Sequence, residues 1–165
     1  MASRACVPCG AGWLLDDKIP ARLMDGVGTQ KFNGLTTSSA ETRKYFEQGL
    51  ALVYGFNHDE ARRSFREAAR LDPDCAMAFW GIAHTLGTNY NVPGAKEQNE
   101  AGTQAIAIAR SLSARASEME RALIEATSLR FPTPAPDSVE TQAAADQAYS
   151  AAMCAMSRAR RPRRC

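Results

Sequence analysis

Apolar and small side chains recur between residues 38 and 157 with the spacing of amphipathic helices. The run Ser38-Ser39-Ala40-Glu41 has the spacing of a capping box and predicts a helix start. A stripe with a period of 3.6 residues follows it, consisting of Tyr45, Gly49, Leu52, Val53 and Phe56. Gly55 is expected to end this helix, because glycine is the usual residue after a last helical turn.

A second helix is predicted directly afterwards. Asn57 is the expected N-cap, and His58 and Asp59 fall in the first turn, where they are interpreted as part of the helix start rather than as an acid–base pair. The residues expected to be buried are Ala61, Phe65, Ala68 and Ala69. The helix should stop near Leu71, since Pro73 disfavours helical geometry before it. Such a short connection predicts an antiparallel helix hairpin.

The pattern then begins again. Asp74 is expected to cap a third helix that ends at Gly87, with a buried stripe of Phe79, Ile82, Ala83 and Leu86. Three pairs lie 34 residues apart: Tyr45 and Phe79, Gly49 and Ala83, Leu52 and Leu86. A helix pair that repeats every 34 residues is typical of tetratricopeptide repeats.

Later units follow this pattern less closely. An insertion from Thr88 to Gly94 precedes a helix expected over 95–112. Ser113 is the expected cap of a third unit, whose stripe comprises Met119, Ala122, Leu123 and Ala126. After a proline-rich stretch, Asp137 and Glu140 predict a last helix start, followed by Ala145, Tyr149 and Ala152 at the spacing of Ala61, Phe65 and Ala68.

The chain is therefore expected to be all-α, with about three hairpins stacked as a short solenoid over residues 37–157. Residues 1–36 contain many glycines and prolines and are expected to form an extended lead-in. Residues 158–165 form a basic tail, which we interpret as a premature or frame-shifted terminus because an alanine- and methionine-rich helix changes abruptly into arginine and proline.

The stretch from Tyr45 to Asn91 resembles the opening repeats of bacterial tetratricopeptide-repeat proteins, which are generally longer, so the chain resembles an amino-terminal portion of one. The resemblance extends over about residues 20–157. The places that correspond to the repeat core are Tyr45, Gly49, Leu52, Ala61, Phe65, Ala68, Pro73, Phe79, Ala83 and Leu86.

The resemblance also implies a concave face that binds a protein or peptide segment. By spacing, its groove residues are Arg43, Phe46, Leu50, Met77, Trp80, His84, Glu120 and Ile124. Members that grip a terminal carboxylate use several basic and amide side chains, whereas this groove offers Arg43 alone, so apolar recognition is expected. The alternative for Phe46 and Trp80 is packing against the lead-in or against further repeats.

Composition and charge add limits to this interpretation. The chain has 165 residues, of which 45% are hydrophobic and 23% charged, as in a soluble globular domain. No apolar run is long enough to span a membrane. The net charge of +2 depends on five arginines in residues 158–164; the rest carries 15 Lys and Arg against 18 Asp and Glu. Binding of nucleic acid or an anionic surface through the tail is therefore the alternative function.

Other candidate chemistry is sparse. Cys6 and Cys9 have the spacing of a redox or zinc pair, but neither a second pair nor a surrounding βαβ unit accompanies them. His84 has no ligand one turn away, so no metal site is expected. No catalytic motif is found. We expect a non-catalytic scaffold that needs no cofactor and takes no small-molecule substrate. Cytoplasmic location is expected, with export as the alternative because residues 5–15 weakly resemble a signal peptide.

Overall fold

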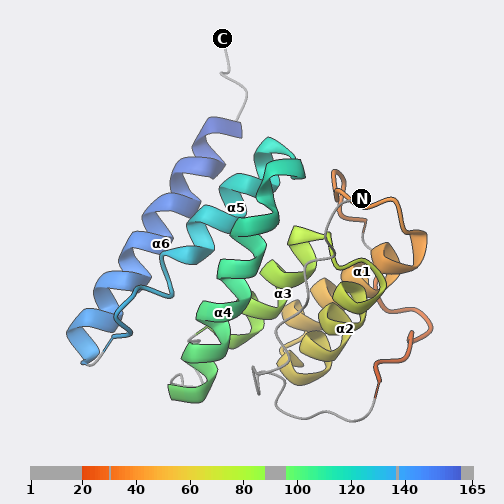
Figure 1. The fold of residues 1–165 in the computed structure, drawn as a ribbon, viewed down its shortest axis with the longest axis horizontal. Helices are drawn as coiled ribbons and strands as arrows, with labels where there is room; N and C mark the ends of the chain where they lie inside the picture. Colours follow the sequence, from red (N-terminus) through yellow and green to blue (C-terminus); the bar gives the residue numbers. More distant parts are fainter. Residues whose placement is uncertain (1–19, 30, 88–95, 137, 161–165) are drawn as a thin grey trace.

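The computed structural model describes residues 20–29, 31–87, 96–136 and 138–160, and these residues form helices with no β-strand among them. The elements are α1 (Ala40–Tyr54), α2 (His58–Leu71), α3 (Ala76–Leu86), α4 (Lys96–Leu112), the short 3-10 helix η2 (Ser113–Arg115), α5 (Glu118–Ser128) and α6 (Val139–Arg160). The expected all-α class is confirmed (Figure 1).

Neighbouring helices pack in chain order, from α1 on α2 through to α5 on α6. In addition, α1 contacts α3 and α3 contacts α5, so these three helices form one layer, with α2 and α4 packed over it. Figure 1 shows the resulting progression from α1 and α2 on one side of the molecule to α6 on the other. This is the packing expected of a helical repeat arrangement.

The first hairpin follows the predicted boundaries closely. Ser39, not Ser38, is the N-cap of α1, because its side chain accepts a hydrogen bond from the Thr42 amide. Gly55 is the C-cap of α1, as predicted. Asn57 caps α2 by accepting from the Glu60 amide, and α2 ends at Leu71, also as predicted.

Two predicted caps are wrong. Cys75 rather than Asp74 precedes α3, and it makes no side-chain capping bond. Ser113 opens η2, and Ser117 caps α5 in a reciprocal capping box with Glu120. In both cases the predicted cap lies one or a few residues before the residue that precedes the helix. The backbone turn before the helix determines which residue becomes the cap. Asp137 and the insertion 88–94 lie outside the described residues.

Phe65 of α2 is at the centre of the core and is fully buried. Gly49 of α1 and Gly81 of α3 both approach its ring closely: a Cβ atom on them would lie 2.7 Å and 2.4 Å from ring carbons. Glycine at these two places therefore lets three helices close around one aromatic side chain. The predicted buried stripes of α2 and α3 are confirmed in full: Ala61, Phe65, Ala68, Ala69, Phe79, Ile82, Ala83 and Leu86.

The α1 stripe is confirmed in part. Gly49 and Val53 are buried, and Tyr45 and Leu52 are partly buried and pack on the core. Phe56 is 79% exposed, contrary to prediction, because α1 ends before it and its backbone has a φ of 61°, which turns the chain toward α2. Pro73 is exposed in the turn between α2 and α3.

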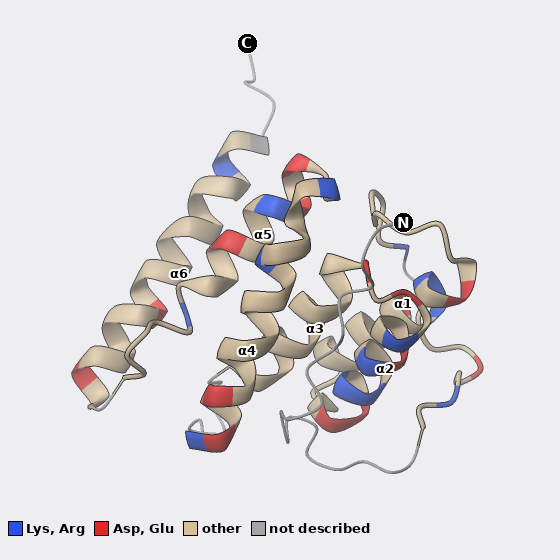
Figure 2. Ribbon diagram, in the orientation of Figure 1, with Lys and Arg blue, Asp and Glu red and all other residues tan. Residues whose placement is uncertain are grey.

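Charged residues are unevenly distributed over the helices (Figure 2). On α2, arginines pair with acids one turn earlier: Arg62 with Asp59, Arg63 with Glu60 and Arg70 with Glu67. On α6, no charged residue occurs between Asp146 and Arg158. None of the described helices is long and apolar enough to cross a membrane.

Candidate functional site

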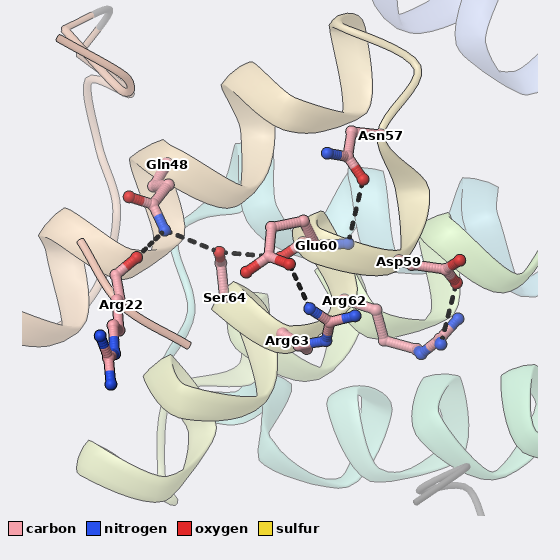
Figure 3. Close-up of polar contacts among 8 residues, drawn as sticks. All are labelled: Arg22, Gln48, Asn57, Asp59, Glu60, Arg62, Arg63 and Ser64. Carbon is pink, nitrogen blue, oxygen red and sulfur yellow. Dashed lines mark hydrogen bonds and ion pairs between the residues drawn. The ribbon is translucent and has the colours of Figure 1, made fainter. Parts of the chain in front are cut away.

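Residues 20–29 and 31–37, here called the N-terminal strap, lie against α1, the α2–α3 connection and α5. Gln48 of α1 fixes the first half of the strap. Its Oε1 accepts a hydrogen bond from the Met24 amide at 2.7 Å. Its Nε2 donates to the Arg22 carbonyl at 2.9 Å and to Ser64 Oγ at 3.0 Å (Figure 3). Gln48 is fully buried, and its amide group is thus paired with the strap and with α2.

Gly28 brings the strap backbone into direct contact with α1. Its φ is 77°, a conformation that favours glycine, and a Cβ atom there would lie 2.7 Å from the Gln48 nitrogen. Gly26 has a similar φ of 78° with no atom within 4 Å of its Cβ position. The close approach is therefore specific to Gly28, and any side chain there would push the strap off the helix.

The next strap residues contact the polar and aromatic side chains of α1. Glu47, whose side chain is 2% exposed, accepts hydrogen bonds from Lys31 Nζ at 2.9 Å and from the Phe32 amide at 3.3 Å. The Phe32 ring meets the Phe46 ring edge to face, with centroids 5.4 Å apart. Backbone and side chain of the strap are thus both recognised here.

The last part of the strap enters the core and reaches α5. Leu35 is 5% exposed, and its carbonyl accepts a hydrogen bond from Arg43 Nη2 at 2.9 Å. Thr36 donates its amide to Glu120 Oε1 at 2.7 Å and its hydroxyl to Glu120 Oε2 at 2.5 Å. Thr37 donates its hydroxyl to Asp72. The strap therefore spans the layer from α1 to α5.

Glu120 is fully buried, and its carboxylate belongs to two sets of hydrogen bonds, one with the strap and one in the capping box of α5. Besides the two bonds from Thr36, its Oε2 accepts from the Ser117 amide at 2.7 Å, which completes the capping box of α5. A buried carboxylate needs donors to compensate for lost hydration, and the strap supplies two of the three described here.

The predicted groove residues do not form an open strip beneath the strap. Arg43, Leu50 and His84 are partly buried, whereas the other five residues are buried, namely Phe46, Met77, Trp80, Glu120 and Ile124. For Phe46, the structure shows the alternative of packing against the lead-in.

Several predicted groove residues are nevertheless brought together. The Phe46 and Trp80 rings lie 6.5 Å apart, and the Trp80 ring stacks on His84 at 5.0 Å. Trp80 Nε1 donates to Thr127 Oγ1 of α5 at 2.8 Å. These contacts link α1, α3 and α5 into one continuous face, on which the strap covers the part near Phe46 and Glu120.

The pKa of His84 in this face departs strongly from its ordinary value of 6.5. Burial lowers its pKa to about 4, and the charges of Arg130 and His58 act in the same direction. Its Nδ1 atom is buried and has no hydrogen-bond partner among the described residues. A neutral imidazole stacked on Trp80 is therefore the state at pH 7.

The surroundings of Cys75 and His58 are those of structural rather than reactive side chains. Burial raises the pKa of the Cys75 thiol to about 11, so this thiol is protonated and unreactive at neutral pH. Asp59 beside His58 pairs with Arg62 at 3.0 Å. The described part of the chain contains no group of three or more His, Cys, Asp or Glu residues placed to hold a metal ion. Cys6 and Cys9 lie outside it.

A hollow of about 300 Å³ lies where the start of α2 meets the end of α3. Its lining residues are Phe56, Asn57, His58, Asp59, Arg62, Thr85, Gly87 and Gln98.

At the other end of the molecule, α6 continues through Arg160, so the helix crosses the predicted boundary between residues 157 and 158. Arg161, Arg163 and Arg164 lie outside the described residues.

Comparisons with known proteins leave the interpretation to this geometry. No protein-family model matches the chain, and neither the curated proteins nor the solved structures yield a match.

Proposed function

We propose that this chain is a non-catalytic interaction module, similar to a tetratricopeptide-repeat protein of about three hairpins, that binds a peptide or protein segment on the face formed by α1, α3 and α5. The 34-residue recurrence and the layered packing of α1, α3 and α5 support the repeat interpretation. In such arrays, the first helices of successive units line the binding face.

The observation that carries the proposal is the way this face holds the strap. Glu47 and Glu120 accept hydrogen bonds from strap amides, and Arg43 donates to a strap carbonyl. Contacts from side chains to main chain provide affinity for an extended backbone, and pockets for particular side chains provide specificity. The face has both, because Phe46 meets an aromatic ring and the core accepts Leu35.

The test uses the full chain with the strap loosened by Phe32→Ala and Leu35→Ala. A random peptide library displayed on phage is selected against this variant, and enriched peptides are synthesised and titrated by fluorescence anisotropy. We expect saturable binding that weakens about tenfold or more when Arg43→Ala is added, because a charged hydrogen bond to the ligand backbone is lost.

The matched control is Arg70→Ala. Arg70 is exposed on α2, where it pairs with Glu67, and its loss should leave peptide binding unchanged. Circular dichroism confirms that each variant keeps its helix content. If no peptide is enriched, or if enriched peptides bind the Arg43→Ala variant equally well, this face is not a peptide site.

A further inference from the structure

The strap contacts this face through three side chains at a fixed spacing. Phe32 meets Phe46, Leu35 enters the core three residues further on, and Thr36 bonds Glu120 through both its amide and its hydroxyl. The intervening Asn33 and Gly34 are exposed. Asn33 and Gly34 form a turn in which Gly34 has a φ of 96°, a conformation that favours glycine. The face therefore contacts an aromatic residue, a two-residue turn with glycine second, and an aliphatic residue followed by a hydroxyl.

The charges on the face restrict the ligand further. Glu47, Glu120 and Asp72 all present carboxylates to the strap. The strap donates to them from Lys31, from two backbone amides and from two threonine hydroxyls. An acidic or phosphorylated residue at the Thr36 position would face a buried carboxylate and be repelled. The preferred ligand is thus basic or hydroxyl-bearing, and a segment that binds through its terminal carboxylate is disfavoured.

The strap is built as a tethered occupant rather than as a part of the helix array. Its first half is anchored through Gln48 and Gly28, while residues 31–37 contribute two apolar side chains and leave Lys31, Asn33 and Gly34 exposed. If residues 31–37 leave the face, the anchored half keeps them nearby. A tethered ligand competes at an effective concentration in the millimolar range.

We infer that the α1/α3/α5 face selects a partner segment of the pattern aromatic, any residue, Gly, aliphatic, Thr or Ser, and that the strap is a resident copy of this ligand which the partner must displace. This inference rests on the proposed function and specifies both its ligand and its regulation. The partner is a segment of another protein that can make the same turn and that carries a basic residue before the aromatic one, as Lys31 precedes Phe32.

The probe is a labelled synthetic peptide with the sequence of residues 29–38, TQKFNGLTTS. It is titrated by anisotropy against three full-length chains: the unaltered chain, the Phe32→Ala and Leu35→Ala double variant, and Leu23→Ala as a control in an exposed part of the strap. We expect the double variant to bind the probe about tenfold or more tightly than the other two chains, because the competitor has been weakened.

Probe variants test the pattern itself. Thr36→Val in the probe removes the hydroxyl at nearly constant shape and should weaken binding to the double variant about tenfold, as should Phe32→Ala. Asn33→Ala, at an exposed position, should change nothing. Should the double variant lose helix content, a full chain with Thr36→Val alone provides the milder release of the strap.

The outcomes separate this inference from the proposed function. Equal probe affinity for all three chains would overturn the competition, and equal affinity of all probe variants would overturn the pattern. In either case, library peptides that depend on Arg43 would still leave the proposed function intact. A dimer of the unaltered chain that dissociates in the double variant would show that the strap occupies a second copy, and would overturn its role as a competitor within one chain.

Discussion

The helices α2 and α6 carry the same pattern of alanine, aromatic residue and alanine, yet the two aromatic side chains differ in how deeply they are buried. Phe65 of α2 is fully buried, while Tyr149 of α6 is partly exposed and carries the Arg130 guanidinium 5.0 Å from its ring centre. The difference follows from the neighbours: α2 packs against both α1 and α3, whereas among the described elements α6 packs against α5. The pattern marks the inward face, and the flanking helices decide how completely it is buried.

The same contrast separates the two ends of the helix array. The strap covers α1, where buried polar groups such as Gln48 find their partners. On α6, Ala145 is the buried residue of the helix within the described range, and several alanines are exposed: Ala143, Ala144, Ala148, Ala151 and Ala155. The high helix propensity of alanine therefore supports α6 where few of its side chains are buried.

The sharpest test of this comparison removes the two aromatic rings. Phe65→Ala should lower the free energy of unfolding by about 3–5 kcal/mol, because it leaves a cavity between Gly49 and Gly81. Tyr149→Ala should cost about 1–2 kcal/mol, since the ring is only partly buried. Urea denaturation followed by circular dichroism measures both. Equal losses would show that the two helices are equally well packed in solution.

A second test compares two glycines of the strap. Gly28→Ala should destabilise the chain by about 1–3 kcal/mol more than Gly26→Ala, because both have positive φ but the Gly28 Cβ would collide with the α1 backbone. Thermal denaturation of the two variants gives the difference directly. Variants of equal stability would mean that the strap does not stay in contact with α1.

A pH titration tests the burial of His84 in α3, the helix that packs against both α1 and α5. The His84 pKa of about 4 lies below its ordinary value of 6.5, so the unfolded chain binds this proton more readily. Stability should therefore fall as the pH drops from 6.5 toward 4, by about 1–3 kcal/mol. The difference between the unaltered chain and His84→Gln, measured by urea denaturation at each pH, isolates this contribution from carboxylate titration. A difference that does not change with pH would contradict the burial of His84.

The smallest effect is expected on the exposed side of α6. Ala148→Glu should change the free energy of unfolding by less than about 0.5 kcal/mol, because the position is exposed and glutamate is a good helix former. Thermal denaturation and size-exclusion chromatography check stability and association together. A loss above about 1 kcal/mol would reveal that another surface covers α6.

Much of the helix pattern could be predicted from local residues. The cap at Asn57, the ends of α1 and α2, the end of α3 at Gly87 and the buried stripes of α2 and α3 follow from turn and capping chemistry and from a 3.6-residue period. These features depend on residues close in sequence, which is why a single chain is sufficient to locate them.

The strap could not be predicted in the same way, because its partners are distant. The repeat resemblance predicts Phe46 and Glu120 in a groove, with packing on the lead-in as the alternative for Phe46, and Phe32 and Thr36 in fact contact them. One signal was available in the sequence: Glu47 and Gln48 directly precede Gly49, in a turn that faces the core, where unpartnered polar side chains would be costly. Polar residues at such places indicate that a segment elsewhere in the chain supplies donors or acceptors.

The bond between Thr36 and Glu120 joins residues 84 positions apart in the chain. Arrays of stacked helix pairs normally fold through contacts between sequence neighbours, so their units can form and fray independently. A connection across this distance raises the contact order and makes the strap one of the last elements that can dock, because both α1 and the start of α5 must exist first. The strap thereby couples the first helix to the fifth, so that they are expected to unfold together rather than one after the other.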